Sequence, residues 1–149
     1  TVHTKTAGGT VSLNLKIRIP YWCRQTFRVS DRIGSLPEPS GDSGYYTIHR
    51  TFADGDWIDV STPYALHLCY TNDAYEVYPA ASLMYGPLVM TALSRRTGWI
   101  TLNLPPVLED AFEIRWDTKP TLWYDDLEFI PSYAAHNQPY HTYFKINLA

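Results

Sequence analysis

Hydrophobic and polar residues alternate with a period of two in the first patterned stretch of the chain. Between Val11 and Ile19, aliphatic residues occupy every odd position and polar or charged residues every even position. Successive side chains of a β-strand point to opposite faces, so this pattern predicts a strand with one face in a core and one in water. Pro20 has no backbone N–H to donate to a ladder and is expected to end the strand.

The rest of the chain predicts short strands separated by turns. Tyr45–Phe52 and Trp57–Val60 are expected to form a hairpin whose turn is Ala53–Asp56, with Gly55 free to adopt a positive φ. Gly86-Pro87 is expected to kink or bulge the stretch around it, and residues 34–44 read as a loop. The other expected strands lie at residues 26–30, 66–70, 81–84, 88–93, 100–104, 111–116, 121–124, 127–130 and 141–148.

The succession of short strands determines the expected fold class. No stretch of ten residues keeps the i, i+3, i+4, i+7 spacing of an amphipathic helix. Short strands separated by Gly/Pro turns predict an all-β fold, namely an antiparallel β-sandwich with a jelly-roll-like character. Residues 1–94 are predicted to form the main sandwich. Residues 95–149, after a break near 94–98, either complete that sandwich or form a small second β domain.

Composition and charge exclude several classes of partner. Charged residues make up 18% of the 149-residue chain, below the roughly 25% of an average globular protein, so a folded domain is expected. The net charge of -3 and the absence of a Lys/Arg run argue against nucleic acid or an anionic membrane as partner. Thr1 is no initiator and no signal segment follows it, which indicates an excised or processed chain. The residues do not distinguish a secreted or periplasmic location from a cytoplasmic one.

The two cysteines are too few for a disulfide framework. Cys23 follows Tyr21 and Trp22, and Cys69 precedes Tyr70. In such surroundings a thiol commonly packs as a small hydrophobic group, so both are expected to be buried. A Cys23–Cys69 bridge is the less favoured alternative.

Four segments, in order, resemble one family of enzymes. The strand LKIRIPYWC (Leu15–Cys23) resembles the L-x-I-R-I-P-x-W strand that opens the sandwich after the catalytic barrel in glycoside hydrolase family 127, the bacterial β-L-arabinofuranosidases first catalogued as a domain of unknown function. The segment YYTIHRTFADGDWIDVSTP (Tyr45–Pro63) resembles the hairpin of that family, with Phe52 at a usual tryptophan position. SLMYGPLVM (Ser82–Met90) resembles its A-x-x-x-G-P-L-V strand, and YHTYFKI (Tyr140–Ile146) resembles a closing C-terminal strand.

This resemblance implies a domain without the catalytic residues. Members of the family are believed to use a cysteine nucleophile near a zinc ion held by further cysteines and a glutamate, all in an upstream (α/α) barrel. A zinc site of that kind needs clustered thiolates, whereas the two cysteines here lie 46 positions apart in the sequence. The chain is therefore expected to carry no catalytic residue, no metal and no cofactor, with zinc implied only for the absent barrel of the parent enzyme, which would act on L-arabinofuranosides.

Acidic residues and histidines give weaker signals. Asp54 and Asp56 are a possible carboxylate pair for glycoside cleavage, but turn chemistry is the favoured interpretation, since Asp caps turns through its own backbone. Asp125-Asp126 is also interpreted as a turn. The spacing of His136 and His141 lacks the third ligand that a metal site requires.

The aromatic content suggests sugar binding. The chain has 12 Tyr, 5 Trp and 5 Phe, and the C–H faces of sugars stack on such rings. Candidate carbohydrate-binding residues are Tyr21, Trp22, Tyr75, Tyr78, Trp123 and Tyr124. The favoured alternative for these rings is a role in the sandwich core and in covering the barrel.

Three functional hypotheses follow. The first is a non-catalytic accessory domain that packs against and supports an upstream barrel of the same polypeptide. The second is a stand-alone carbohydrate-binding module for a plant-type glycan, and the third is an assembly domain that forms homodimers. A row of solvent-facing aromatic rings would favour the second, and self-association without sugar affinity would favour the third.

Overall fold

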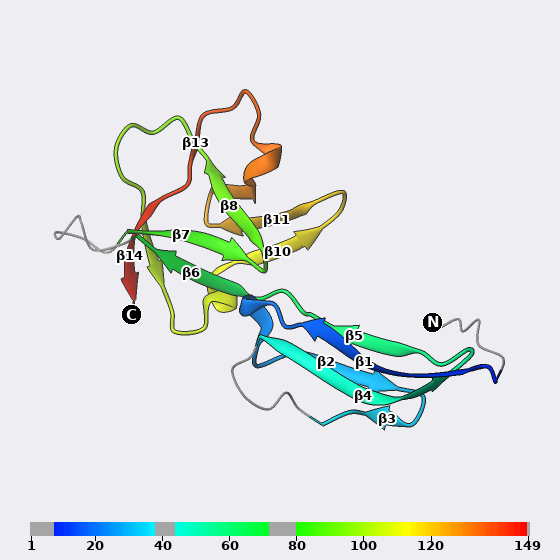
Figure 1. The fold of residues 1–149 in the computed structure, drawn as a ribbon. Coiled ribbons are helices and arrows are strands. Elements are labelled where there is room, and N and C mark those ends of the chain that lie inside the picture. The colour runs from blue at the N-terminus through cyan, green and yellow to red at the C-terminus, as the bar shows by residue number, and fades with distance from the viewer. Residues whose placement is uncertain (1–7, 38–43, 72–79, 149) are drawn as a thin grey trace. The chain divides into compact units, whose positions relative to one another are not determined.

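The computed structural model describes residues 8–37, 44–71 and 80–148 and is almost entirely β (Figure 1). Within those ranges the only helical elements are three short 3₁₀ turns, namely η1 (Tyr21–Cys23), η2 (Leu108–Ala111) and η3 (Ser132–Ala134). The expected all-β, sandwich-like fold is thereby confirmed. No helix in the described ranges has the length and apolar character needed to cross a membrane. The chain divides into two compact units, Thr1–Pro63 and Tyr64–Ala149.

The first unit contains two sheets that enclose a small core. Strand β1 (Thr10–Arg18) pairs antiparallel with β4 (Tyr45–Ala53) over its whole length. The second sheet has the order β3 (Gly34–Ser35), β2 (Arg28–Asp31), β5 (Ile58–Ser61). Period-two alternation holds on β4, whose inward-facing residues join the core. On β1, Val11, Leu15 and Ile17 pack against this core, but Leu13, also expected to face inward, is exposed. The buried residues of this core are Ile19, Cys23, Phe27, Val29, Tyr46, Ile48 and Phe52.

The hairpin expected from Tyr45–Phe52 and Trp57–Val60 is wrong. The turn between them forms as predicted, because the Asp56 carboxylate accepts a 2.9 Å hydrogen bond from the Ala53 N–H. However, β4 pairs with β1 while β5 pairs with β2. The turn therefore carries the chain from one sheet to the other, which lets Phe52 and Ile58 pack into the same core.

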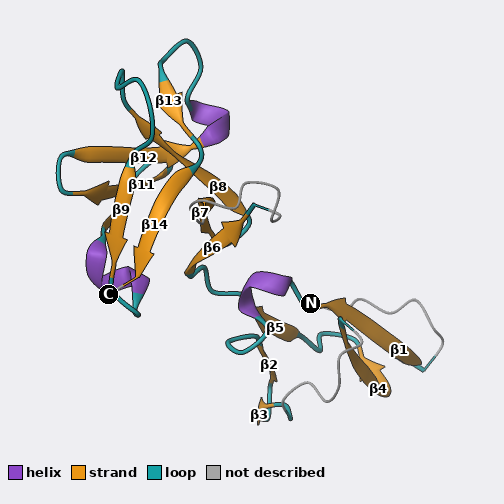
Figure 2. Ribbon diagram, turned by 90° about the vertical axis from the view of Figure 1, so that its left-hand side faces the viewer, coloured by secondary structure: helices purple, strands orange, loops and turns teal. Residues whose placement is uncertain are grey.

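The second unit is one curled sheet of nine strands around a larger core (Figure 2). The order is β10-β11-β12-β8-β7-β14-β9, with β6 also paired to β7 and β13 to β8. The strands are β6 (Leu66–Tyr70), β7 (Ala80–Tyr85), β8 (Leu88–Leu93), β9 (Thr101–Leu104), β10 (Glu113–Trp116), β11 (Pro120–Tyr124), β12 (Leu127–Pro131), β13 (Tyr140–His141) and β14 (Phe144–Leu148). Fully buried core side chains include Leu83, Met90, Leu102, Leu122, Phe129 and Phe144.

The division expected at residues 94 and 95 falls inside this second unit. Strand β8, before the division, pairs with β12 and β13, which come after it. One pair in the sheet, β14 with β9, is parallel rather than antiparallel, and Figure 2 shows these two strands side by side.

Gly86-Pro87 forms a two-residue hairpin turn rather than the expected kink or bulge. Tyr85 stands opposite Leu88 in the β7–β8 ladder, so both strands continue up to the turn. Gly86 has a φ of 56°, and proline holds its own φ near −65°. A positive φ at the first central position alone is the pattern of a type II′ turn, which matches the twist of the flanking strands.

Candidate functional site

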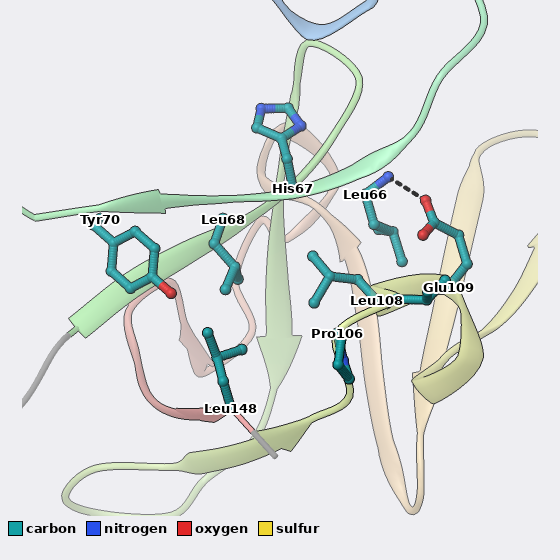
Figure 3. Close-up of a pocket in the computed structure, with 9 residues that line it drawn as sticks. Leu66, His67, Leu68, Tyr70, Pro106, Leu108, Glu109 and Leu148 are labelled. Atoms are coloured by element: carbon teal, nitrogen blue, oxygen red, sulfur yellow. Dashed lines mark hydrogen bonds between the residues drawn. The ribbon is translucent and has the colours of Figure 1, made fainter.

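A shallow apolar groove lies beside β6 in the second unit (Figure 3). It has a volume of about 530 Å³. Its lining residues come from β6, from the segment around η2 and from the end of β14, namely Leu66, His67, Leu68, Tyr70, Pro106, Val107, Leu108, Glu109 and Leu148. The His67 imidazole points away from the other lining side chains in Figure 3, so the surface offered by the groove is mostly aliphatic.

The groove follows the open edge of β6. In the described ranges β6 pairs with β7 alone. The Ala65 carbonyl accepts from Gly86 N–H and the Thr71 N–H donates to the Ala80 carbonyl, so the odd-numbered backbone groups face β7. The even-numbered groups therefore face the groove. The Leu66 N–H accordingly donates a 2.9 Å hydrogen bond to Oε1 of Glu109 (Figure 3).

This groove has the chemistry of a binding surface rather than of a catalytic centre. Glu109 is the one carboxylate among its lining residues, and one of its oxygens caps a strand edge. Glycoside cleavage normally needs two carboxyl groups facing each other across the bond. The groove can hold an apolar group, but it has no acid–base pair.

A second feature of the same unit is a cluster of three aromatic rings. Tyr64 lies two residues before the start of β6, Tyr85 ends β7 and Trp116 ends β10. The ring centroids lie 5.5 Å apart for Tyr64–Tyr85, 5.9 Å for Tyr85–Trp116 and 6.1 Å for Tyr64–Trp116. The indole N–H of Trp116 donates a 3.2 Å hydrogen bond to the Tyr85 hydroxyl. The rings of Tyr64 and Trp116 remain partly open to solvent, with exposed fractions of 39% and 59%.

The aromatic pairs predicted from the sequence have different placements. Tyr21 and Trp22 are in edge-to-face contact, with centroids 5.4 Å apart, and Trp22 also packs against the core of the first unit. Trp123 lies beside Arg115, whose guanidinium carbon is 6.0 Å from the ring centroid. Tyr124 packs on the core and its hydroxyl donates to the Asn103 carbonyl at 3.0 Å.

Trp123 and Tyr124 are consecutive residues of a strand and so point to opposite faces of the sheet. Tyr75 and Tyr78 lie outside the described residues. The cluster of Tyr64, Tyr85 and Trp116 carried no signal in the sequence, because its rings come from three separate segments that only the sheet brings together.

The acidic candidates and His136 lie in turns and loops, whereas His141 ends the short strand β13. Asp56 caps its own turn, and Asp125 has a φ of 50° in the tight β11–β12 connection, so both turn predictions are confirmed. Nε2 of His141 lies 3.0 Å from the Arg96 carbonyl oxygen, and His136 is exposed. Among the described residues, no three His, Cys, Asp or Glu side chains gather where they could hold a metal ion.

The two cysteines are both free thiols and do not form a bridge. Cys23 is buried as expected, and burial raises the pKa of its thiol. The expectation for Cys69 is wrong, because this residue is exposed on β6. A raised thiol pKa disfavours the thiolate that zinc binding and nucleophilic attack require. The described residues therefore do not fit the zinc site of the family that the sequence resembles.

The main buried ionic interaction of the first unit joins its two sheets. Asp31 on β2 is buried and its carboxylate accepts a 2.5 Å hydrogen bond from Arg50 on β4. The Ile33 and Gly34 N–H groups also donate to Oδ1 of Asp31, at 2.8 and 3.3 Å. These backbone hydrogen bonds, with the guanidinium, lower the pKa of Asp31 despite its burial. The Arg50 guanidinium also lies 4.7 Å above the Phe52 ring, so the pair has a structural role.

Comparison with known proteins gives a clear match in structure. No protein-family model and no curated protein matches the sequence. A GH127 β-L-arabinofuranosidase from Geobacillus stearothermophilus T6 superposes with a TM-score of 0.72 and 19% identity, over 95% of this chain and 27% of the enzyme.

Two further enzymes match in the same way. A GH127 β-arabinofuranosidase gives a TM-score of 0.72 and 19% identity over 93% of this chain and 28% of its own. A glycoside hydrolase gives a TM-score of 0.68 and 15% identity, over 91% of this chain and 28% of its own. The chain thus spans little more than a quarter of the length of these proteins and shares the fold of that part.

Proposed function

We propose that this chain is the non-catalytic β-sandwich region of a larger glycoside hydrolase similar to the family 127 β-L-arabinofuranosidases. In the proposal it lies C-terminal to an (α/α) barrel of the same polypeptide, packs against that barrel and supports it. The observation that carries the proposal is the fold match, which covers 91–95% of this chain but only 27–28% of each matching enzyme.

The local chemistry supports a role without catalysis. In the described ranges, the candidate acidic pair Asp54 and Asp56 belongs to a turn, and the groove beside β6 uses its carboxylate to cap a strand edge. The cysteine nucleophile and the zinc implied by the resemblance belong, in this proposal, to the barrel. A homodimer formed through this region and the sugar-binding roles of Tyr21, Trp22, Trp123 and Tyr124 remain predictions.

A hydrolysis assay tests the proposal. The purified chain is incubated with a chromogenic aryl β-L-arabinofuranoside, with and without added Zn²⁺, and release of the aryl group is followed. We expect no release above the enzyme-free blank under either condition, because no nucleophile and acid–base pair face each other within residues 8–37, 44–71 and 80–148. Saturable release that scales with protein concentration would show that the chain is itself a hydrolase and would overturn the proposal.

A further inference from the structure

We infer that Trp116 and Tyr64 form a stacking site for a sugar residue, positioned by Tyr85. The site lies within the second unit and is distinct from the aromatic pairs suggested by the sequence. Carbohydrates present apolar C–H faces rimmed by hydroxyl groups, so they bind where exposed aromatic rings are bordered by polar side chains. Both features occur here.

The rings are held in place before any ligand arrives. The Trp116 indole is fixed by its hydrogen bond to the Tyr85 hydroxyl and by contact with the rings of Tyr64 and Tyr85. Tyr64 lies directly over Gly86, where an added Cβ would come within 2.7 Å of its ring. A surface that is already ordered loses little side-chain entropy on binding, whereas a flexible exposed tryptophan would lose more.

A turn with charged residues follows the exposed Trp116. Trp116 is the last residue of β10, and the turn that follows it carries Asp117 and Lys119, whereas the side chain of Arg115 points to the opposite face of the sheet. The core of a protein–protein interface is depleted of charged residues. One exposed indole at the start of a turn with charged residues therefore fits an amphipathic sugar better than an apolar protein surface.

Binding is measured by calorimetry and tryptophan fluorescence on the whole chain with arabino-oligosaccharides and xylo-oligosaccharides. The choice of probes, though not the site, rests on the proposed function. We expect saturable millimolar binding of at least one probe, which Trp116→Ala weakens by about tenfold or more. Tyr85→Phe removes the hydroxyl but no ring, and we expect it to weaken binding several-fold by releasing the indole.

Trp99→Ala is the matched control. Trp99 is 60% exposed, close to the 59% of Trp116, and in the described ranges no aromatic ring packs on it; Lys145 Nζ lies 6.0 Å from its centroid. We expect this variant to bind like the parent. Should Trp116→Ala unfold, the two single variants Trp116→Phe and Tyr85→Phe provide the test. Each of them should bind more weakly than Trp99→Ala.

Three results would overturn the inference. They are no binding of any probe by the parent chain, unchanged binding by Trp116→Ala or Trp116→Phe, and an equal loss in Trp99→Ala. If no probe binds but Trp116→Ala abolishes association with the catalytic barrel, the rings belong to the barrel interface. In that case the sugar site fails while the accessory role stands. The opposite result, sugar binding without barrel association, retains the site and removes the accessory role.

Discussion

Single residues hold the second unit together where strands end or turn. Glu109 supplies its carboxylate to a strand edge, because the Leu66 N–H has no carbonyl partner on that side of β6 in the described ranges. Gly86 supplies both a positive φ and the space that the Tyr64 ring occupies. Each of these roles predicts a specific cost of substitution.

Glu109→Ala should lower the free energy of unfolding by about 1 kcal/mol, because the N–H of the buried residue Leu66 loses its acceptor. Urea unfolding followed by circular dichroism measures the difference. Asp110→Ala is the control, since it removes the neighbouring carboxylate of the same 3₁₀ turn. Equal effects of the two substitutions would contradict the capping role of Glu109.

Gly86→Ala should destabilise the chain by more than Gly98→Ala. Both glycines have a positive φ, 56° and 94°, so both substitutions incur a backbone cost of about 1–2 kcal/mol. Only at Gly86 does a Cβ meet a ring, at 2.7 Å from Tyr64, and displacing that ring should add about 1–3 kcal/mol. Thermal melts of the two variants give the comparison. A Gly98→Ala melt at or below that of Gly86→Ala would argue against close packing of Tyr64 on the turn.

At the scale of elements, pairing rather than strand formation decides the architecture. The ends of β6 and β8 match the sequence prediction, and both ends of β1 lie one residue earlier than predicted. The agreement is close because a period of two, or a short apolar run, identifies a strand from local sequence. Pairing depends on distant partners. The sequence of the 53–56 turn is compatible both with a return to the neighbouring strand and with a crossing to the opposite sheet. The β4–β5 hairpin was therefore predicted wrongly. The parallel β14–β9 pair and the two-residue strand β3 left no local signal either.

The contact between Asp31 and Arg50 links the two sheets of the first unit and predicts a pH dependence. Because the folded-state pKa of Asp31 is lowered, its contribution to stability is present above the ordinary aspartate pKa of about 3.9 and is lost as pH falls through the folded pKa. Asp31→Asn should therefore melt below the parent at pH 7, and the difference should shrink towards pH 2.

Asp59→Asn is the control for this pH dependence. Asp59 stands opposite Ser30 in the same sheet but is exposed, so its substitution should change the melting temperature little at either pH. If the gap between Asp31→Asn and the parent is the same at pH 7 and pH 2, the pair does not contribute through its charge.

At the scale of the whole molecule, the sequence predicted the fold class and the likeness to family 127 but not the boundary between the units. The boundary at Pro63 and Tyr64 has no glycine-rich linker to mark it, whereas the Ser94–Gly98 loop that suggested a division joins strands of one sheet. The aromatic cluster was missed for a related reason, since its three rings meet only once β6, β7 and β10 are in place.

Association with a catalytic barrel tests the central claim most directly. The (α/α) barrel that the proposal places upstream in the same polypeptide is expressed separately and mixed with this chain, and the molar mass is measured by gel filtration with light scattering. We expect one peak whose mass equals the sum of one barrel and one chain, with a higher melting temperature than the barrel alone. Two separate peaks, with the barrel equally stable in both samples, or a natural polypeptide without a barrel, would contradict the accessory role.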